Sequence, residues 1–426
     1  MASNTPAFIN FLFLYSLILP LISTQNISPP IKTLVLPIAK HPSTLQYITN
    51  LYQRTPLVPI NLVINLGGPF LWVSCDNSSY NSSSYRSANC KSPICSLTHK
   101  FLNIKPQCND NICMIRAENV ITSKISSGNL SIDVLSLRAT DGLNPTNLAS
   151  IPRFVFWCAP EFLLQGLPSE ATGIVGLGHS QLSLPTQLAN QFNFTRKFAI
   201  CLSPSMNSNG VIFIGEEPYV LFPGIDVSKI LIYTPLAITS KNVGEFSDPH
   251  EYWINVRYIR INGRHVPFNS SYTKIKTKIS TINPYTILES SVYNSVTNYF
   301  IQEAIAANNT RVNEVAPFRV CFSTTTDQVG SITRPAMPFV DLMMQSELVF
   351  WRIFETNLMV PVNKNTACLG FLDGGINQKY GIIVGGYQLE DNFVQFDIEK
   401  SRLGFTSSLL LKETSCDSFN FTTTSV

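Results

Sequence analysis

The residues that could do chemistry are few, and the most informative one lies in an apolar stretch. Residues 62–75 read Leu-Val-Ile-Asn-Leu-Gly-Gly-Pro-Phe-Leu-Trp-Val-Ser-Cys, so one apolar run enters a glycine turn and a second apolar run leaves it. This pattern predicts a strand, a turn and a second strand. Asn65 is the lone polar side chain at the turn, and its amide cannot serve as a base for a water molecule. The turn therefore carries a polar group but no acid or base.

Other catalytic or metal-binding constellations are missing from the sequence. There is no Ser-His-Asp order with a nucleophile-elbow motif. Two Cys-x4-Cys pairs lie between Cys75 and Cys113, but zinc ligands are commonly two residues apart and no histidine is suitably interleaved. These cysteines predict a disulfide-stapled surface loop, and we expect neither a metal nor a cofactor. The histidines are scattered without metal spacing: His41, His99, His179, His250 and His265.

Length and composition bound the elements that must position these residues. The 426 residues exceed one ordinary domain, and a hydrophobic content of 45% supplies two lobes with ample core. Charged residues make up only 13%, and the richness in Thr, Ser, Val, Ile, Phe and Tyr favours a mainly β chain. A net charge of +3 is too slight to indicate a nucleic-acid partner.

Periodicity predicts the individual elements. A helix is expected over residues 289–306, where apolar residues recur at helical spacing, and a shorter one begins near residue 186. An Asn-Gly pair at 262–263 predicts a tight turn after a strand. Strands are predicted at residues 33–38, 46–48, 154–158, 210–215, 252–256, 259–263, 394–398 and 403–405.

The N-terminus is typical of a secreted protein. Residues 8–21 are apolar and are followed by small residues at 22–25, which predicts a signal peptide over residues 1–24. No later run reaches transmembrane length. Ten cysteines, an even number, indicate disulfides and an oxidising compartment. We therefore expect a protein of the extracellular space or cell wall.

Glycosylation acceptors support the same location. The acceptor pattern Asn-x-Ser/Thr recurs along the chain, and Pro29 weakens the copy at Asn26. The remaining candidates are Asn77, Asn81, Asn129, Asn193, Asn269, Asn308 and Asn420.

Disulfide pairing is open from sequence alone, and we state one hypothesis. It nests Cys90 with Cys113 around Cys95 with Cys108. The other pairs that it takes are Cys75 with Cys158, Cys201 with Cys416, and Cys321 with Cys368.

The stretch around Asn65 resembles the first active-site segment of pepsin-like aspartic proteases, where Asp-Thr-Gly or Asp-Ser-Gly follows apolar residues and precedes a Trp. Residues 278–288 align without a gap with the second such segment in its plant form, which places Ser280 at the second aspartate and Ile282 at the glycine. That chemistry needs two carboxylates sharing one proton. The resemblance implies that both carboxylates are missing.

Further segments extend this resemblance. Residues 119–137 resemble the flap hairpin over the protease cleft, with Ile121 where the family has a tyrosine. Residues 171–178 resemble the segment that threads behind the active-site turn, and residues 383–385 repeat it. The resemblance implies a mainly β, bilobal, pepsin-like double-ψ β-barrel fold with a central cleft. Its lobes would span residues 25–222 and 223–426.

The amino-acid sequences of three segments, 66–73, 279–286 and 385–392, are similar to those of plant xylanase inhibitors, extracellular dermal glycoproteins and legume basic globulins. This resemblance implies a non-proteolytic monomer that inhibits a microbial glycoside hydrolase, either a xylanase or a xyloglucan endoglucanase, in plant defence. It implies no cofactor, nucleic acid or membrane span. Two alternatives remain open: an extracellular ligand-binding or receptor-like wall glycoprotein, and a residual aspartic endopeptidase.

The same resemblance points to contact residues. Inhibitors of xyloglucan endoglucanases in this group place arginines from loops of the C-terminal lobe into the enzyme's carboxylate cleft. Arg334 matches one of these arginines, whereas Glu413 stands where the other would be. The group's xylanase inhibitors use a histidine on a C-terminal loop, and no histidine follows His265 here.

Overall fold

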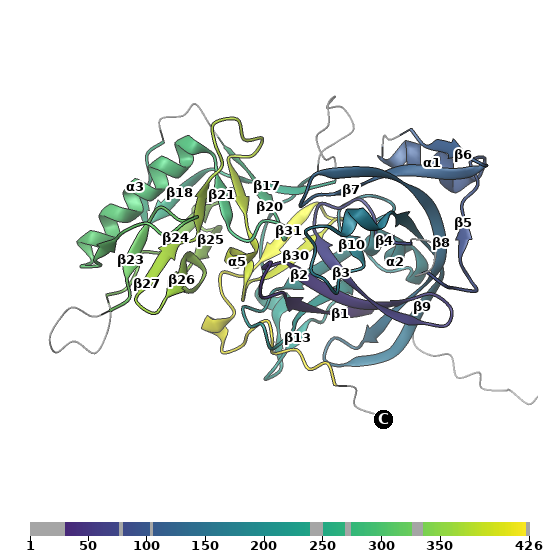
Figure 1. Cartoon of the computed structure of the whole chain (residues 1–426). Coiled ribbons are helices and arrows are strands. Elements are labelled where there is room, and N and C mark those ends of the chain that lie inside the picture. Colours follow the sequence, from purple (N-terminus) through teal and green to yellow (C-terminus); the bar gives the residue numbers. More distant parts are fainter. Residues whose placement is uncertain are drawn as a thin grey trace, which may run out of the picture. The chain divides into compact units, whose positions relative to one another are not determined.

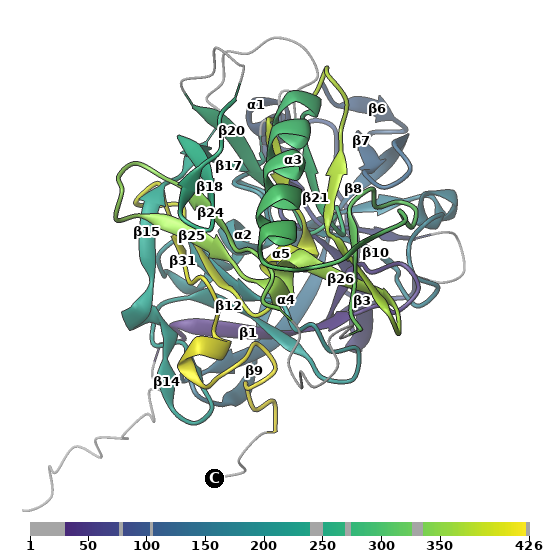
Figure 2. The same cartoon turned by 90° about the vertical axis from the view of Figure 1, so that its left-hand side faces the viewer.

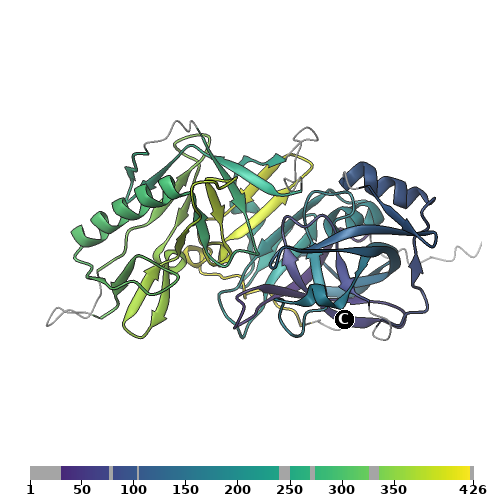
Figure 3. The ribbon, with the colours of Figure 1, turned by 45° about the horizontal axis from the view of Figure 1, so that its top comes forward.

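Strands dominate the chain, as its composition predicted. The computed structural model describes residues 30–75, 80–102, 105–238, 250–268, 274–325 and 335–422. Ile31–Val426 form one unit and Met1–Pro30 another. Within Ile31–Val426 the elements gather in two lobes, and the fold is bilobal and mainly β (Figures 1 and 3).

The largest sheet draws strands from both ends of this unit. Strands β30 (Phe393–Asp397) and β11 (Lys197–Cys201) pair antiparallel, so late residues extend a sheet that early residues begin. In spatial order the sheet contains β15 (Ile232–Pro235), β31 (Arg402–Phe405), β30 (Phe393–Asp397), β11 (Lys197–Cys201), β12 (Gly210–Gly215), β1 (Thr33–Lys40), β2 (Tyr47–Gln53), β3 (Val58–Asn65), β10 (Gly173–Gly176), β4 (Trp72–Ser74), β9 (Pro145–Ala159), β8 (Lys124–Thr140), β7 (Ile112–Asn119) and β6 (Gln107–Asn109), with β5 (Arg86–Ser87) paired to β8.

Smaller sheets make up the second lobe and one hairpin. The sheet that carries Ser280 at a strand end contains β16 (Ala237–Ile238), β17 (Tyr252–Val256), β20 (Ile275–Ile279), β29 (Ile382–Val384), β21 (Thr286–Leu288) and β28 (Phe371–Asp373). The others are β19 (Arg264–His265), β18 (Tyr258–Ile261), β24 (Val340–Met343) and β25 (Phe350–Ile353); β22 (Arg311–Val312), β23 (Cys321–Ser323), β27 (Thr366–Leu369) and β26 (Met359–Asn363); and the hairpin β13 (Val220–Leu221) with β14 (Ile225–Asp226).

Helices cover the sheets and contribute buried side chains to the main core. The longest described one, α3 (Ser290–Ala306), confirms the predicted helix and lies over strands of the second lobe (Figure 2). The Glu289 carboxylate caps it by accepting from the Ser291 N–H, which satisfies a free donor of the first turn. The others are α1 (Pro93–Leu102), α2 (Leu184–Phe192), α4 (Glu355–Leu358) and α5 (Gly386–Leu389), with 3-10 turns η1 (Glu161–Leu164), η2 (Val227–Ile230) and η3 (Leu410–Lys412). None of the described helices is both long and apolar enough to cross a membrane.

The internal duplication predicted from the two apolar-apolar-Gly segments is confirmed. Strand β10 runs parallel to β3 and sets Gly176 beside Asn65, while β29 runs parallel to β20 and sets Val384 beside Ile279. Gly173 must be glycine because an added Cβ would lie 1.9 Å from the Trp72 carbonyl oxygen. Each lobe thus threads one buried strand behind one turn.

Five disulfides staple the fold, and no described cysteine is free. Three pairs match the hypothesis: Cys75–Cys158, Cys201–Cys416 and Cys321–Cys368. The nested pairing is wrong, because Cys90 bonds Cys108 and Cys95 bonds Cys113. Cys95 and Cys113 are both buried, whereas Cys90 is half-buried and Cys108 exposed. The fold therefore joins the two buried cysteines to each other and the two more exposed cysteines to each other.

Candidate functional site

Two buried turns lie at the centre of the predicted site. Asn65 ends β3 and is 7% exposed, and Ser280 follows β20 and is 3% exposed. Leu62 and Ile64 of β3 and Ile275 and Ile279 of β20 belong to the buried core, so each polar side chain is held at a strand end by its own sheet. This arrangement confirms the strand, turn and strand predicted around Asn65.

The Asn65 side chain stabilises its own turn. Its Oδ1 accepts a hydrogen bond from the Gly67 N–H at 3.0 Å. Its backbone carbonyl accepts from the N–H groups of Gly68 at 3.1 Å and Leu177 at 2.9 Å. The amide therefore has a structural hydrogen bond, and it has no proton-accepting group for catalysis.

Ser280 is used in the same way. Its N–H donates to the Val384 carbonyl at 3.0 Å, which continues the β20–β29 pairing. Its hydroxyl donates to Asn283 Oδ1 at 2.8 Å and accepts from the N–H groups of Ile282 and Asn283, both at 3.2 Å. These bonds are local to the turn, so the hydroxyl is an anchor of the turn and not an activated nucleophile.

One hydroxyl joins the two turns. Thr281 Oγ1 donates to the Ile64 carbonyl at 2.7 Å and accepts from the Leu66 N–H at 3.4 Å. Leu66 occupies the matching position beside Asn65 and is apolar, so it returns no such bond. The contact brings the backbones next to Asn65 and Ser280 together, although the two residues are far apart in sequence.

A carboxylate that sequence reasoning missed lies beside the first turn. A Cβ built on Gly67 would lie 3.0 Å from Glu251 Cγ. Glu251 forms ion pairs with Lys278 and, at 3.4 Å, with Lys379, and accepts a hydrogen bond from Tyr380 Oη at 2.6 Å. No motif marks Glu251, because its place is set by how β17 packs against a distant turn.

Its surroundings keep Glu251 ionised. Burial would raise the pKa of its carboxyl, but the Lys278 ammonium, with the Tyr380 and Lys379 contacts, brings that pKa below its ordinary value. An aspartic protease dyad needs the opposite condition, in which one of two carboxyls stays protonated. Among the residues that the structure describes, the polar partners of Glu251 are cations and a phenol, so it does not replace the dyad.

Two profiles of known protein families match this chain, one in its N-terminal half and one in its C-terminal half. The family profile described as xylanase inhibitor N-terminal matches residues 47–216, and the one described as xylanase inhibitor C-terminal matches residues 251–407. The chain belongs to this xylanase-inhibitor family.

Related proteins of this family come from plants. The chain is 47% identical to a probable aspartic proteinase GIP2 of Nicotiana benthamiana, over 92% of each chain. Among solved structures it is similar to edgp, at 46% identity with a TM-score of 0.85, covering 92% of this chain and 99% of that one. Soybean basic 7S globulin is 37% identical with a TM-score of 0.78, covering 92% and 99%. These matches confirm the resemblance and the pepsin-like fold.

The flap-like hairpin of this chain is held near its tip by hydrogen bonds. It is formed by β7 and β8, so it extends beyond the predicted 119–137 on both sides. Buried Asn119 donates to the carbonyls of Leu163 at 2.7 Å and Gln165 at 2.9 Å, and its Oδ1 accepts from the Ile121 N–H at 2.8 Å. Ile121 and Ile282 both pack against the apolar cluster that contains Trp72. Ile121 thus makes an apolar contact at this end of the hairpin.

A cavity of about 410 Å³ lies beside this hairpin and away from the two turns. Neither Asn65 nor Ser280 lines it. Its walls include the Cys75–Cys158 disulfide, Tyr80, Tyr85, Gly128 and Asn129.

The predicted contact residues are only partly described. Arg334 lies outside the described residues, as do the acceptors Asn77 and Asn269. Glu413 is exposed just after η3, with a left-handed φ of 57°. The acceptors Asn81, Asn193, Asn308 and Asn420 are exposed, and Asn129 is half-buried within β8; glycosylation of all of these stays a prediction.

The fold brings two of the scattered histidines together. The rings of His179 and His250 lie 5.4 Å apart between centroids. Burial, with the charge of His179 adding to it, lowers the pKa of His250 to about 3, so it is neutral at physiological pH. No group of three or more metal-ligating side chains occurs among the described residues.

Proposed function

We propose that the chain is a secreted, glycosylated and non-proteolytic family member that binds and inhibits a microbial glycoside hydrolase. The single observation that carries the non-proteolytic part is the use of Asn65 and Ser280 as hydrogen-bonded turn anchors in place of two acids. Peptide hydrolysis by this fold needs a shared proton between two carboxylates, and these positions supply none.

A residual aspartic endopeptidase is the alternative that the name of the tobacco relative suggests. An acid proteolysis assay with and without pepstatin tests it directly. We expect no cleavage of a protein substrate across the acid range, because neither dyad position can carry a negative charge. Cleavage that pepstatin abolishes would establish the endopeptidase instead.

The inhibitory role is supported by the family descriptions and by the chemistry of the proposed partner. A glycoside hydrolase presents two carboxyl groups in its cleft, and a guanidinium is always charged and forked to match them. We assign this contact to Arg334. Glu413 adds a carboxylate where the resemblance implies a second arginine, so Arg334 would bear the contact without it.

Titration against microbial xylanases and xyloglucan endoglucanases tests the proposal. The matched control is Arg153→Ala, which removes an exposed arginine of β9 in the other lobe. We expect the parent to inhibit at least one enzyme, Arg334→Ala to weaken inhibition by roughly 30-fold as for a central interface arginine, and Arg153→Ala to match the parent.

The possible failures are distinct. If the parent inhibits no enzyme of the panel, the extracellular ligand-binding alternative replaces the inhibitor. If Arg334→Ala inhibits as well as the parent, the inhibitor role stands and the contact assignment is wrong.

The location and organisation are part of the same proposal. Five disulfides require an oxidising compartment to form and persist, which fits export to the extracellular space or cell wall. The signal peptide over residues 1–24 and the lobes 25–222 and 223–426 remain predictions. Mass spectrometry of the mature N-terminus would measure the cleavage site.

A further inference from the structure

Three lysines gather on one face of the sheet that ends at Ser280. Lys276 and Lys278 alternate along β20 with the buried residues Ile275, Thr277 and Ile279, so they leave the strand on the same side. Lys379 lies just before β29, the neighbour of β20. We call Lys276, Lys278, Lys379 and the adjacent Trp253 the lysine face.

Aromatic rings hold these ammonium groups close to one another. Lys276 Nζ lies 4.3 Å from the Trp253 ring centroid and 5.0 Å from that of Tyr380. The Nζ atoms of Lys379 and Lys278 lie 4.9 and 5.9 Å from the same Tyr380 centroid. Cation–π attraction stabilises each ammonium, but it does not neutralise the charge.

The lysine face carries more positive charge than its described carboxylate can balance. Glu251, with its side chain 8% exposed, pairs with Lys278 and Lys379, whose side chains are 21% and 42% exposed. Burial lowers the pKa of Lys276, repulsion from Lys379 lowers it further, and Glu251 offsets this only in part. Among the described residues, three ammonium groups thus share one carboxylate.

The sheet limits what kind of ligand can reach these groups. Strands β17, β20 and β29 each pair with a neighbour on both sides, so no added strand can dock on their backbones. The lysines are partly covered and rise from a sheet face. A ligand must therefore lie along the face and be bound by side chains.

We propose that the lysine face binds a carboxylated polysaccharide, a polymer of uronic acid residues. Each uronate unit carries its carboxylate on a rigid ring, so successive carboxylates can meet neighbouring ammonium groups with little loss of conformational freedom. An acidic peptide presents its carboxylates on flexible stems, which must lose more conformational entropy on binding. This site is separate from the contact assigned to Arg334 and does not depend on inhibition of a hydrolase.

Isothermal titration of the full-length protein with an oligogalacturonate at low ionic strength tests the proposal. The test variant is Lys276→Gln/Lys379→Gln, which keeps Lys278 as the partner of buried Glu251. The matched control is Lys229→Gln/Lys400→Gln, which removes two exposed lysines elsewhere. We expect the parent and the control to bind, salt to weaken binding, and the test variant to bind roughly tenfold more weakly.

Further probes separate the remaining outcomes. A neutral oligogalactan should not bind, because it lacks the carboxylate. The proposal is overturned if the parent does not bind oligogalacturonate, if the test variant binds like the control, or if poly-L-glutamate binds more tightly than the sugar. Equal thermal unfolding midpoints for both variants would exclude misfolding. Unchanged hydrolase inhibition by the test variant would keep this site distinct from the proposed function.

Discussion

At the scale of single residues, Asn65 and Ser280 have a hydrogen-bonding role in their own turns. The amide oxygen still accepts from Gly67, and the hydroxyl still accepts from two N–H groups of its own turn. Both side chains are short and polar, so each can satisfy backbone groups of its own turn, and neither is a carboxylic acid. The two side chains therefore serve as turn anchors, which is the observation behind the proposed lack of proteolysis.

Aspartates placed at positions 65 and 280 should make the free energy of unfolding depend on pH. In Asn65→Asp/Ser280→Asp, burial and mutual repulsion would raise at least one carboxyl pKa above its unfolded value. The contribution of this carboxyl to stability is then fully present below its unfolded pKa and is lost as pH rises through its folded pKa. We expect the free energy of unfolding to drop by about 2 kcal/mol more than in the parent between pH 4 and pH 7.

Chemical denaturation at the two pH values measures this loss. Ser280→Ala is the control, since it alters the same turn without adding a titrating group. A double variant whose stability follows the parent at both pH values would show that the two positions are not a buried, coupled pair.

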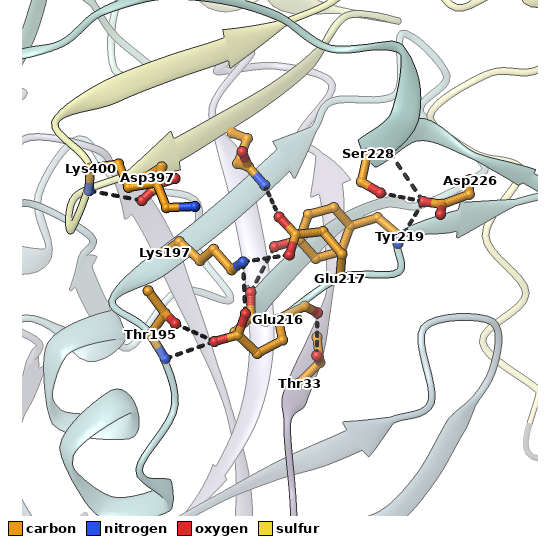
Figure 4. A network of polar contacts seen from close by, with 12 residues as sticks. Thr33, Thr195, Lys197, Glu216, Glu217, Tyr219, Asp226, Ser228, Asp397 and Lys400 are labelled. Atoms are coloured by element: carbon orange, nitrogen blue, oxygen red, sulfur yellow. Dashed lines mark hydrogen bonds and ion pairs between the residues drawn. The ribbon is translucent and has the colours of Figure 1, made fainter.

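At the scale of elements, an ion cluster links the strands where the late residues join the large sheet. Lys197, the first residue of β11, lies between the carboxylates of Glu216 and Glu217 after β12, with Glu216 Oε2 at 2.7 Å (Figure 4). Gln395 of β30 donates to Glu217 Oε1 at 2.9 Å. The cluster therefore connects three neighbouring strands.

Removing the central lysine should destabilise the protein most at neutral pH. Burial acts to raise the pKa values of Glu216 and Glu217, but Lys197 brings both below their ordinary value. Their contribution is thus present above the unfolded carboxyl pKa and is lost as pH falls through the folded values. We expect Lys197→Met to cost about 2 kcal/mol at pH 7, after allowance for partly exposed carboxylates, and much less at pH 3.

Urea unfolding at both pH values checks the cluster. Lys400→Met, at an exposed lysine in the turn after β30, is the matched control and should be neutral. An equal cost of Lys197→Met at both pH values would mean that lost packing, and not charge, accounts for the effect.

At the scale of the whole molecule, a disulfide and a strand pairing tie the C-terminal segment to the middle of the chain. The Cys201–Cys416 disulfide closes a separation of 215 residues, whereas Cys90–Cys108 closes 18. Together with the β11–β30 pairing, the long link holds the C-terminal segment against the first lobe.

The two disulfides should differ in their effect on stability. Loop-closure entropy grows slowly with loop length, so Cys201→Ala/Cys416→Ala should cost about 5 kcal/mol and Cys90→Ala/Cys108→Ala about 3 kcal/mol. Guanidinium unfolding of both double variants beside the parent measures the difference. A larger loss from the short loop would show that local packing, not chain closure, sets the contribution of these bonds.

The sequence by itself determined the features that depend on neighbouring residues. Apolar runs around a glycine turn predicted β3 with its turn, helical spacing predicted α3, and Asn65 and Ser280 are not carboxylic acids. The resemblance of whole segments was enough to place the chain in its family. These signals are local, so they survive without knowledge of which elements are neighbours.

Only the tertiary structure decided which distant residues meet. Sheet order and strand register decide that Cys90 bonds Cys108 while Cys95 bonds Cys113. They also decide the approach of Glu251 to Gly67 and the hydrogen bonds by which Thr281 joins the two turns. The lysine face likewise exists only because β20 and β29 are neighbours. Sequence periodicity tells which face of a strand is buried but not which strand lies beside it, and that choice is made by packing of the whole unit.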